Sequence, residues 1–211
     1  MSGKRFLWWV VVAGAVFSTA CSHQEAAKEA KPAPPEYKVR MQTTKGDVVI
    51  LVHRDWAPIG ADHFYELVKM GFYDNNGFFR TVPDFIVQWG MNGDPKVNRD
   101  WSEITVKDDP PKVSNKIGTV VFAQTSDPNS RTTQLFINLG DNSKSLDAQN
   151  FTPFGEVIQG MDNVMRITMQ YREEPSQTAI GETGNAYLEE HFPHLDYTKK
   201  LTIVPQLELL P

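Results

Sequence analysis

The sequence predicts a mainly β fold, either a barrel or a sandwich, and three observations carry this prediction. From Tyr37 onward, short runs of β-branched and aromatic residues alternate with turn residues. Only two segments are predicted to form helices, and neither is long. The 211 residues are 40% hydrophobic and contain no internal repeat, which suits one domain with a sizeable core.

The first two strands, residues 39–43 and 47–52, are predicted to form a hairpin. They are joined at Lys45-Gly46, where glycine can take the positive φ that a tight turn needs. A helix follows, because Pro58 favours a first helical turn and Gly71 marks its end. Between them an apolar face recurs at three- and four-residue spacing, formed by Phe64, Leu67, Val68 and Phe72.

The rest of the folded part is predicted to contain more short strands and one more helix. The strands are expected at residues 77–81, 85–89, 119–124, 134–138, 153–157 and 201–209, and the helix at residues 161–167. Residues 94–116 and 170–200 are polar and poorly patterned, so we predict loops there, the second with a helical turn at 186–190. Periodicity alone does not decide whether the sheet closes.

The N-terminal segment has the pattern of an export signal. Lys4 and Arg5 precede an apolar run, residues 6–17, that is short for a stable membrane span. The next four residues, Ser-Thr-Ala-Cys ending at Cys21, resemble a bacterial lipobox, in which the cysteine carries the lipid. Plain secretory cleavage and an uncleaved anchor are the alternatives, since Ser18 and Ala20 also fit a small-residue cleavage site.

Three regions are therefore expected along the chain. Residues 1–20 form the signal segment, residues 21–36 a tether rich in Ala, Lys, Glu and Pro, and residues 37–211 the folded domain. The tether is either a spacer that holds the domain off a membrane or a disordered leader. The expected location is the bacterial cell envelope, as a periplasm-facing lipoprotein, with a soluble periplasmic or secreted protein as the alternative.

Charge and cysteine content exclude several kinds of site. With 21 Lys+Arg against 26 Asp+Glu and a net charge of −5, the body has no dense basic stretch, which argues against nucleic-acid binding. Cys21 is the single cysteine, so internal disulfides and cysteine-based metal sites are excluded. Four histidines offer no compact set of carboxylate or cysteine partners, so we expect no metal site at His53, His63, His191 or His194.

The stretch from residue 79 to residue 90 carries the strongest chemical signal. It reads F-R-T-V-P-D-F-I-V-Q-W-G, so an arginine precedes a turn and an apolar strand returns with a glutamine. If the two strands lie side by side, Arg80, Phe85 and Gln88 converge as a charged fork beside an aromatic wall and an amide. Such a site suits an extended peptide. A lone strand arginine is more often a solvated or ion-paired surface residue, so on residue types alone both interpretations stay open.

The pattern F-R-x-x-P-x-F-x-x-Q-x-G resembles the signature of the cyclophilin-type peptidyl-prolyl cis/trans isomerases. Downstream, Ala123-Gln124 followed by Gln134-Leu135-Phe136-Ile137 is similar to the second active-site segment of that family. Leu146-Asp147 with residues 154–157 is similar to its third, and residues 64–74 resemble its first helix. Four ordered blocks over residues 39–166 identify the chain as a member of this family.

The resemblance implies a closed eight-stranded antiparallel β-barrel capped by two α-helices, with a peptide groove on its outer face. It makes Arg80 the catalytic residue and implies a set of substrate-binding residues: Phe85, Ile86, Gln88, Ala123, Gln124, Gln134, Phe136, Leu146 and Phe151. It also implies that catalysis requires no cofactor and no metal. The expected partners are proline-containing polypeptides and, through the lipid on Cys21, a membrane, and the chain is expected to be a monomer.

The expected function is peptidyl-prolyl isomerisation in exported proteins. The alternative is a proline-peptide-binding chaperone or interaction module with little turnover, motivated by two departures from the family. Ser145 stands where strongly cyclosporin-binding cyclophilins have Trp, and Phe151 stands near their groove histidine. A purely structural envelope lipoprotein would rest on the anchor and tether alone.

Overall fold

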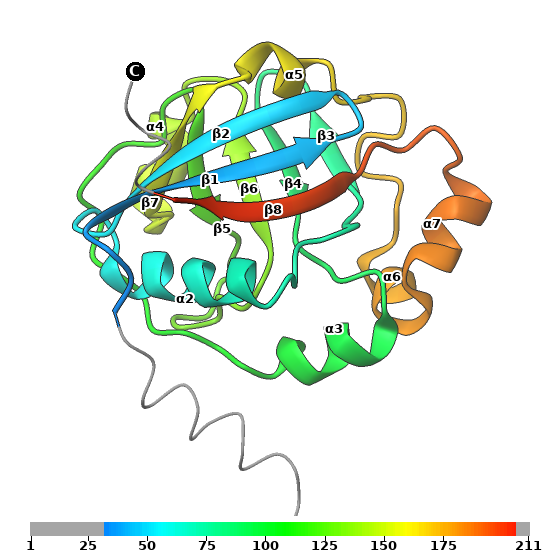
Figure 1. Cartoon of the computed structure of the whole chain (residues 1–211), viewed down its shortest axis with the longest axis horizontal. Coiled ribbons are helices and arrows are strands. Elements are labelled where there is room, and N and C mark those ends of the chain that lie inside the picture. The colour runs from blue at the N-terminus through cyan, green and yellow to red at the C-terminus, as the bar shows by residue number, and fades with distance from the viewer. Residues whose placement is uncertain (1–31, 206–211) are drawn as a thin grey trace, which may run out of the picture. The chain divides into compact units, whose positions relative to one another are not determined.

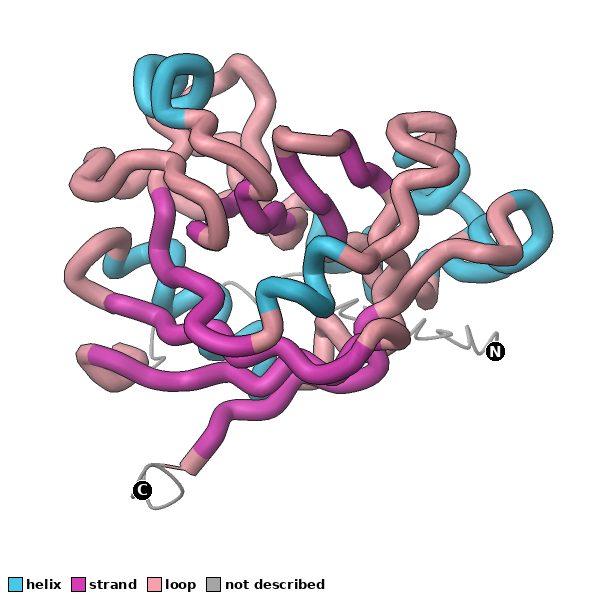
Figure 2. The backbone as a smooth tube through the Cα atoms, turned by 90° about the horizontal axis from the view of Figure 1, so that it is seen from above, coloured by secondary structure: helices cyan, strands magenta, loops and turns pink. Residues whose placement is uncertain are grey.

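The predicted β-runs join into one sheet in the computed structural model, which describes residues 32–205. Its eight strands follow the order β3-β4-β6-β5-β7-β2-β1-β8, and every neighbouring pair is antiparallel. Figures 1 and 2 show that the sheet curves strongly. The strands are β1 Glu36–Thr43, β2 Gly46–His53, β3 Arg80–Val82, β4 Ile86–Trp89, β5 Thr119–Phe122, β6 Leu135–Asn138, β7 Pro153–Gln159 and β8 Thr198–Val204.

The predicted hairpin and the helix after it are confirmed. β1 and β2 pair from Glu36–His53 to Thr43–Gly46, and Gly46 has the positive φ of 120° that the turn requires. Helix α2 (Pro58–Lys69) begins at the predicted proline and buries its apolar face. In Figure 1, α2 lies below β1 and β8, and the short helix α5 (Met161–Met165) lies above β2.

The main core fills the concave side of the sheet. Along β4, Val87 and Trp89 point into this core, whereas Ile86 belongs to a separate apolar cluster on the outer face. The neighbouring strand β6 alternates in the same way, with Ile137 in the core and Phe136 outside. Because successive strand residues face opposite sides, the short central strands build the core and the outer surface at once.

The expected closed barrel is wrong, because the sheet is an open, curled half-barrel. Its edge strands β3 and β8 are not neighbours in the hydrogen-bonded order. The chain just before each edge strand makes an isolated bridge between Gly77 and Tyr197. Beyond this bridge the edges separate, and the edge N–H of Thr81 donates to the carbonyl of Arg172, 3.0 Å away. A segment between α5 and β8 thus occupies the edge position that closure would require.

The expected count of two helices is also too low, since residues 32–205 contain six α-helices and one 3₁₀ turn. Two of the extra helices, α6 and α7, lie in the stretch predicted as a long loop and sit together beside the sheet in Figure 1. Helix α7 covers the helical turn that was predicted at residues 186–190. The loop predicted at 94–116 begins with a helix as well. The additional elements are α3 Pro95–Ser102, α4 Ser143–Leu146, the 3₁₀ turn Asp147–Gln149, α6 Gln177–Thr183 and α7 Asn185–His191.

We call residues 170–197, between α5 and β8, the excursion. It has a small core of its own that includes Ile180, Leu188 and Phe192. This core also takes in Phe79 from the chain just before β3, which is 1% exposed. The excursion is therefore packed against the sheet at the residue that precedes Arg80.

Several predictions at the two ends of the chain lie outside the described residues. They are the signal segment, the lipid attachment at Cys21 and most of the tether, together with residues 206–209 of the last predicted strand. From Ala33 onward the described chain is one compact unit. Within residues 32–205, no helix combines the length and the apolar character needed to cross a bilayer.

Candidate active site

The candidate site lies on the outer face of the sheet, where four strands place their side chains in one row. Arg80 of β3 pairs with Gln88 of β4, Gln88 pairs with Phe136 of β6, and Phe136 pairs with Val121 of β5. Directly paired residues present their side chains on the same face of a sheet. The register therefore sets a guanidinium, an amide, an aromatic ring and an aliphatic floor side by side.

The apolar half of the site is a pocket around Phe136. Ile86, Val121, Phe136 and Leu146 form a buried cluster, each no more than 5% exposed. Phe151 completes one wall, with its ring 5.7 Å from that of Phe136 and inclined at 67°. Such a pocket suits a compact apolar group, because burying an aliphatic ring there removes its surface from water.

Buried amides hold the loops that carry this wall. The Asn115 side chain donates to the carboxylate of Asp147 and to the carbonyl of Phe151, each at 2.8 Å. Asn142 donates to the carbonyl of Phe85, also at 2.8 Å. Since Leu146 precedes Asp147 directly, these bonds fix three residues of the pocket wall: Phe85, Leu146 and Phe151.

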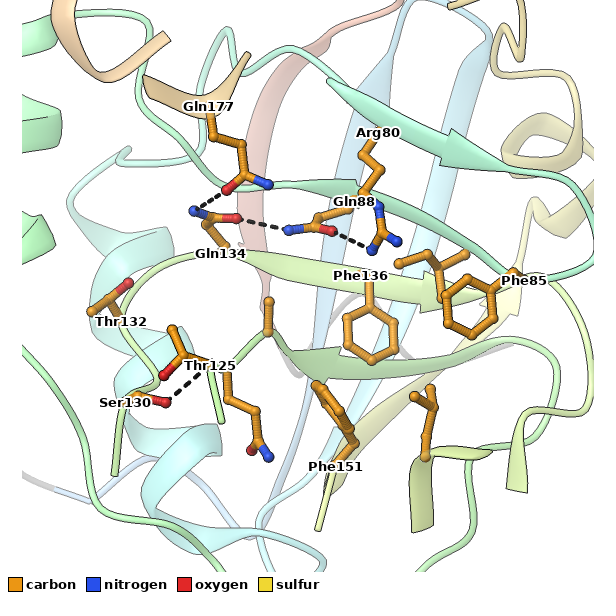
Figure 3. Close-up of a pocket in the computed structure, with 14 residues that line it drawn as sticks. Arg80, Phe85, Gln88, Thr125, Ser130, Thr132, Gln134, Phe136, Phe151 and Gln177 are labelled. Carbon is orange, nitrogen blue, oxygen red and sulfur yellow. Dashed lines mark hydrogen bonds between the residues drawn. The ribbon is translucent and has the colours of Figure 1, made fainter. Parts of the chain in front are cut away.

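The polar half of the site is a chain of side-chain hydrogen bonds, drawn in Figure 3. Arg80 Nη1 donates to Gln88 Oε1 at 3.2 Å, and Gln88 Nε2 donates to Gln134 Oε1 at 2.7 Å. Gln134 Nε2 then donates to Gln177 Oε1 at 3.1 Å. At the other end, Glu173 Oε1 accepts from Arg80 Nε at 2.7 Å. Gln88 is 5% exposed with both ends of its amide bonded, so its orientation is fixed.

The guanidinium stands at the junction of the two halves. Its carbon atom lies 5.9 Å from the centre of the Phe85 ring, and Figure 3 shows Arg80 beside Gln88 and above Phe136. A guanidinium carries five N–H donors, and the contacts with Gln88 and Glu173 use only some of them. Donors therefore remain for a group bound in the pocket.

A buried arginine supports the far side of the groove. Arg131 is 3% exposed, and its Nε donates to Gln124 Oε1 at 3.1 Å while its Nη2 donates to the carbonyl of Asn150 at 2.6 Å. Gln124 in turn donates to the carbonyl of Gln149 at 2.8 Å. Burial lowers the pKa of Arg131, and the nearby carboxylate of Asp108, 3.5 Å from Nε, opposes that shift.

His63 of α2 lies beneath the groove and is neutral. Burial lowers its pKa from 6.5 to about 4, and Nε2 donates to the carbonyl of Thr132 at 2.8 Å. The unfolded chain therefore binds this proton more readily than the folded one. Stability is unaffected at neutral pH, where both states are neutral, and is lost as the pH falls from 6.5 toward 4.

We expect this histidine to lower the free energy of unfolding by about 2 kcal/mol between roughly pH 7.5 and 5. Chemical denaturation of the wild type and of His63→Gln, at a series of pH values, measures the difference. Glutamine can keep the N–H donor but does not titrate, so the variant should show a flatter pH profile. Parallel profiles for the two proteins would contradict the assignment.

The structure brings all ten predicted site residues to this one pocket, which has a volume of about 290 Å³. Four further lining residues were not predicted from the sequence: Thr125, Ser130, Thr132 and Gln177. Glu173 was missed as well, because nothing in the sequence links an exposed loop carboxylate to an arginine 93 residues earlier. In the described part of the chain, no group of three or more His, Cys, Asp or Glu is arranged to hold a metal ion.

The chain is similar to known proteins in both sequence and structure. The family model "Cyclophilin type peptidyl-prolyl cis-trans isomerase/CLD" matches residues 38–183. A peptidyl-prolyl cis-trans isomerase of Acinetobacter baylyi is 35% identical over 133 residues, covering 61% of this chain and 70% of the relative. Peptidyl-prolyl cis-trans isomerase B of Escherichia coli is 33% identical over 136 residues, covering 61% and 82%.

Solved structures support the fold. A cyclophilin from Hirschia baltica has a TM-score of 0.60 at 17% identity, covering 93% of this chain and 84% of its own. A cyclophilin-type isomerase of Cryptosporidium parvum has a TM-score of 0.58 at 21% identity, covering 81% and 99%. The family-model match, over residues 38–183, extends over the strands that carry the pocket. This chain therefore belongs to the cyclophilin-type family of peptidyl-prolyl cis-trans isomerases.

Proposed function

We propose that this isomerase acts on X-Pro bonds of exported proteins and that Arg80 stabilises the twisted amide during rotation. The observation that carries the proposal is the position of the Arg80 guanidinium beside the apolar pocket of Phe136 and Leu146. A proline ring has the size and polarity that such a pocket accepts. In support, the Cryptosporidium parvum cyclophilin has also been crystallised in the presence of the dipeptide Ala-Pro.

Catalysis of X-Pro bond rotation requires only a hydrogen-bond donor that is held in position. The barrier to rotation, about 18–20 kcal/mol, arises because the partial double bond of the amide is lost. As the bond twists, the lone pair localises on the prolyl nitrogen, which becomes a hydrogen-bond acceptor. An N–H of Arg80 aimed at that nitrogen interacts more strongly with the twisted amide than with either planar form, and this difference lowers the barrier.

The pocket and the amide chain supply the remaining requirements. Phe136, Leu146 and Ile86 hold the ring still while the preceding carbonyl turns. Gln88 fixes one edge of the guanidinium through its bond to Nη1. Because the donor is held before the substrate arrives, little reorganisation is needed in the twisted state.

The test is catalysis of cis/trans exchange in X-Pro peptides with several residues before the proline. We expect the full-length protein to accelerate exchange in NMR exchange spectra, and chemical-shift changes in the pocket to report binding of the same peptides. Binding without acceleration for every peptide would replace this proposal with the peptide-binding module described above.

The proposed site of action rests on the N-terminal sequence. A signal-like segment followed by Cys21 supports a lipid-anchored protein of the bacterial envelope. Expressed in a bacterium fed radiolabelled palmitate, the wild type is expected to incorporate label and fractionate with membranes. Cys21→Ser is expected to lose both properties, and a wild type that remains unlabelled would contradict the lipid anchor.

A further inference from the structure

Arg80 is held from a second side by the excursion. Glu173 Oε1 accepts from Nε at 2.7 Å and lies 2.6 Å from Nη2, so this carboxylate contacts the edge of the guanidinium away from Nη1. Gln88 takes Nη1. The planar group is thus fixed by two partners from different parts of the chain.

The backbone around Glu173 is tied to the strand that carries Arg80. Thr81 N donates to the carbonyl of Arg172 at 3.0 Å, so the excursion pairs with the free edge of β3. Arg172 has a φ of 47°, and Glu174 N closes a turn onto the carbonyl of Tyr171 at 2.9 Å. This turn places Glu173 beside Arg80.

Phe79, which precedes Arg80, is also anchored to the excursion. The Phe79 side chain packs with Ile180 and Leu188 in the core of the excursion. Both sequence neighbours of Arg80 are therefore bound to the excursion, one through its side chain and one through its backbone. The contact between Glu173 and Arg80 is built on a packed structure.

The excursion also holds the far end of the polar chain, where Gln177 accepts from Gln134 at 3.1 Å. Gln177 lies four residues after Glu173, and Pro175 between them is buried. One short segment thus contacts both ends of the series Arg80, Gln88 and Gln134. This arrangement restrains the donors that face the groove.

We propose that Glu173 is a positioning residue for isomerisation, which orients the Arg80 guanidinium so that its remaining N–H groups face the bound proline. The proposal rests on the role of Arg80 proposed above. An arginine side chain is long and flexible, and restraining it before substrate binds keeps the donor aimed at the prolyl nitrogen. The partners are 30% and 58% exposed, so the pair contributes little to stability and its effect belongs to turnover.

The experiment compares Glu173→Ala, Glu173→Gln and Glu174→Ala by NMR exchange, which separates kcat from KM. We expect Glu173→Ala to lower kcat about fivefold with KM unchanged. This factor corresponds to the interaction energy of a partly exposed ion pair. Glu173→Gln keeps an acceptor without the charge and should fall between Glu173→Ala and the wild type. Glu174→Ala removes a carboxylate that is also exposed, one residue away, and should match the wild type.

Several results would overturn the proposal. An increase in kcat for Glu173→Ala would show that the carboxylate weakens Arg80 as a donor. An equal loss in Glu174→Ala would show a general charge effect. A rise in KM at constant kcat would make Glu173 a substrate-binding residue.

A double-mutant cycle separates this proposal from the one it rests on. If Glu173 acts through Arg80, then Glu173→Ala should change kcat no further in the Arg80→Ala background. Loss of activity in Arg80→Ala but not in Glu173→Ala would overturn only the positioning role. Full activity in Arg80→Ala would overturn the proposed mechanism itself. Independently of activity, the Nε–H of Arg80 should exchange with water faster in Glu173→Ala, and unchanged exchange would contradict the contact.

Discussion

Replacing Arg80 with alanine is expected to lower kcat/KM for X-Pro isomerisation by about 10²–10³-fold, the loss that follows removal of one oxyanion-hole donor. The variant loses the N–H groups that face the twisted amide, whereas the apolar pocket around Phe136 keeps its contacts. Peptide affinity should therefore change much less than turnover. The measurement is kcat/KM from exchange spectra, with peptide Kd measured in parallel.

Two further variants make this result specific. Arg80→Lys keeps the charge but loses the planar guanidinium that reaches both Gln88 and Glu173. We therefore expect kcat/KM to fall at least about tenfold in this variant. Arg40→Ala removes an exposed arginine whose partner is Asp47, away from the pocket, and should leave turnover unchanged. Wild-type turnover in Arg80→Ala would exclude the guanidinium as the stabilising donor.

Replacing Arg131 with methionine is expected to lower the free energy of unfolding by about 3–5 kcal/mol, because it removes one partner of a buried charged network. The substitution removes the donor at Nη2 from the carbonyl of Asn150, which keeps its bond from Thr152 Oγ1, and the cation from the Asp108 carboxylate, which keeps its bond from Asn129 N. It also removes one of the two hydrogen bonds that hold the side chain of Gln124, which lines the groove. Urea denaturation measures the change, and the melting temperature should fall by about 10 °C.

The matched control for Arg131 is Arg99→Met. Arg99 is an exposed arginine of α3, and its replacement should stay within about 0.5 kcal/mol of the wild type. If Arg131→Met proved as stable as this control, the hydrogen bonds to Asn150 and Gln124 would not stabilise the fold. Peptide binding by Arg131→Met would then show whether they order the groove instead.

The parts of the fold that depend on local pattern could be predicted from the sequence. The first hairpin follows from β-rich runs on either side of a glycine that takes positive φ. Helix α2 follows from Pro58 and an apolar face that is buried along most of its length. In each case the local conformational preference of the residues agrees with the packed structure. Such agreement allows an element to be predicted from the sequence.

The helices that were missed bury too little to leave an apolar pattern. Helix α3 buries only Asn98, and α6 buries only Ile180. Both begin with a capping side chain, at Asp94 and Ser176, that accepts a backbone N–H from the first turn. These caps were visible in the sequence, but a cap without an apolar face is weak support for a helix.

Closure of the sheet and the second partner of Arg80 depend on contacts between distant segments. The carbonyl of Arg172 occupies the edge of β3, and Glu173 reaches Arg80 across 93 residues. Periodicity and propensity carry no information about such contacts. The ten pocket residues could be named because the ordered motifs of a family carry long-range information that a single stretch does not.

The open sheet has two edges, and each is protected from pairing with another chain. Unpaired strand edges act as templates for aggregation unless they are short, charged or covered. Strand β3 has only three residues, and the N–H of Thr81 is already bonded to Arg172. Strand β8 carries Lys199 and Lys200, which are exposed and costly to desolvate against a second strand. The half-barrel thus stays open without offering a surface on which copies of the chain could stack edge to edge.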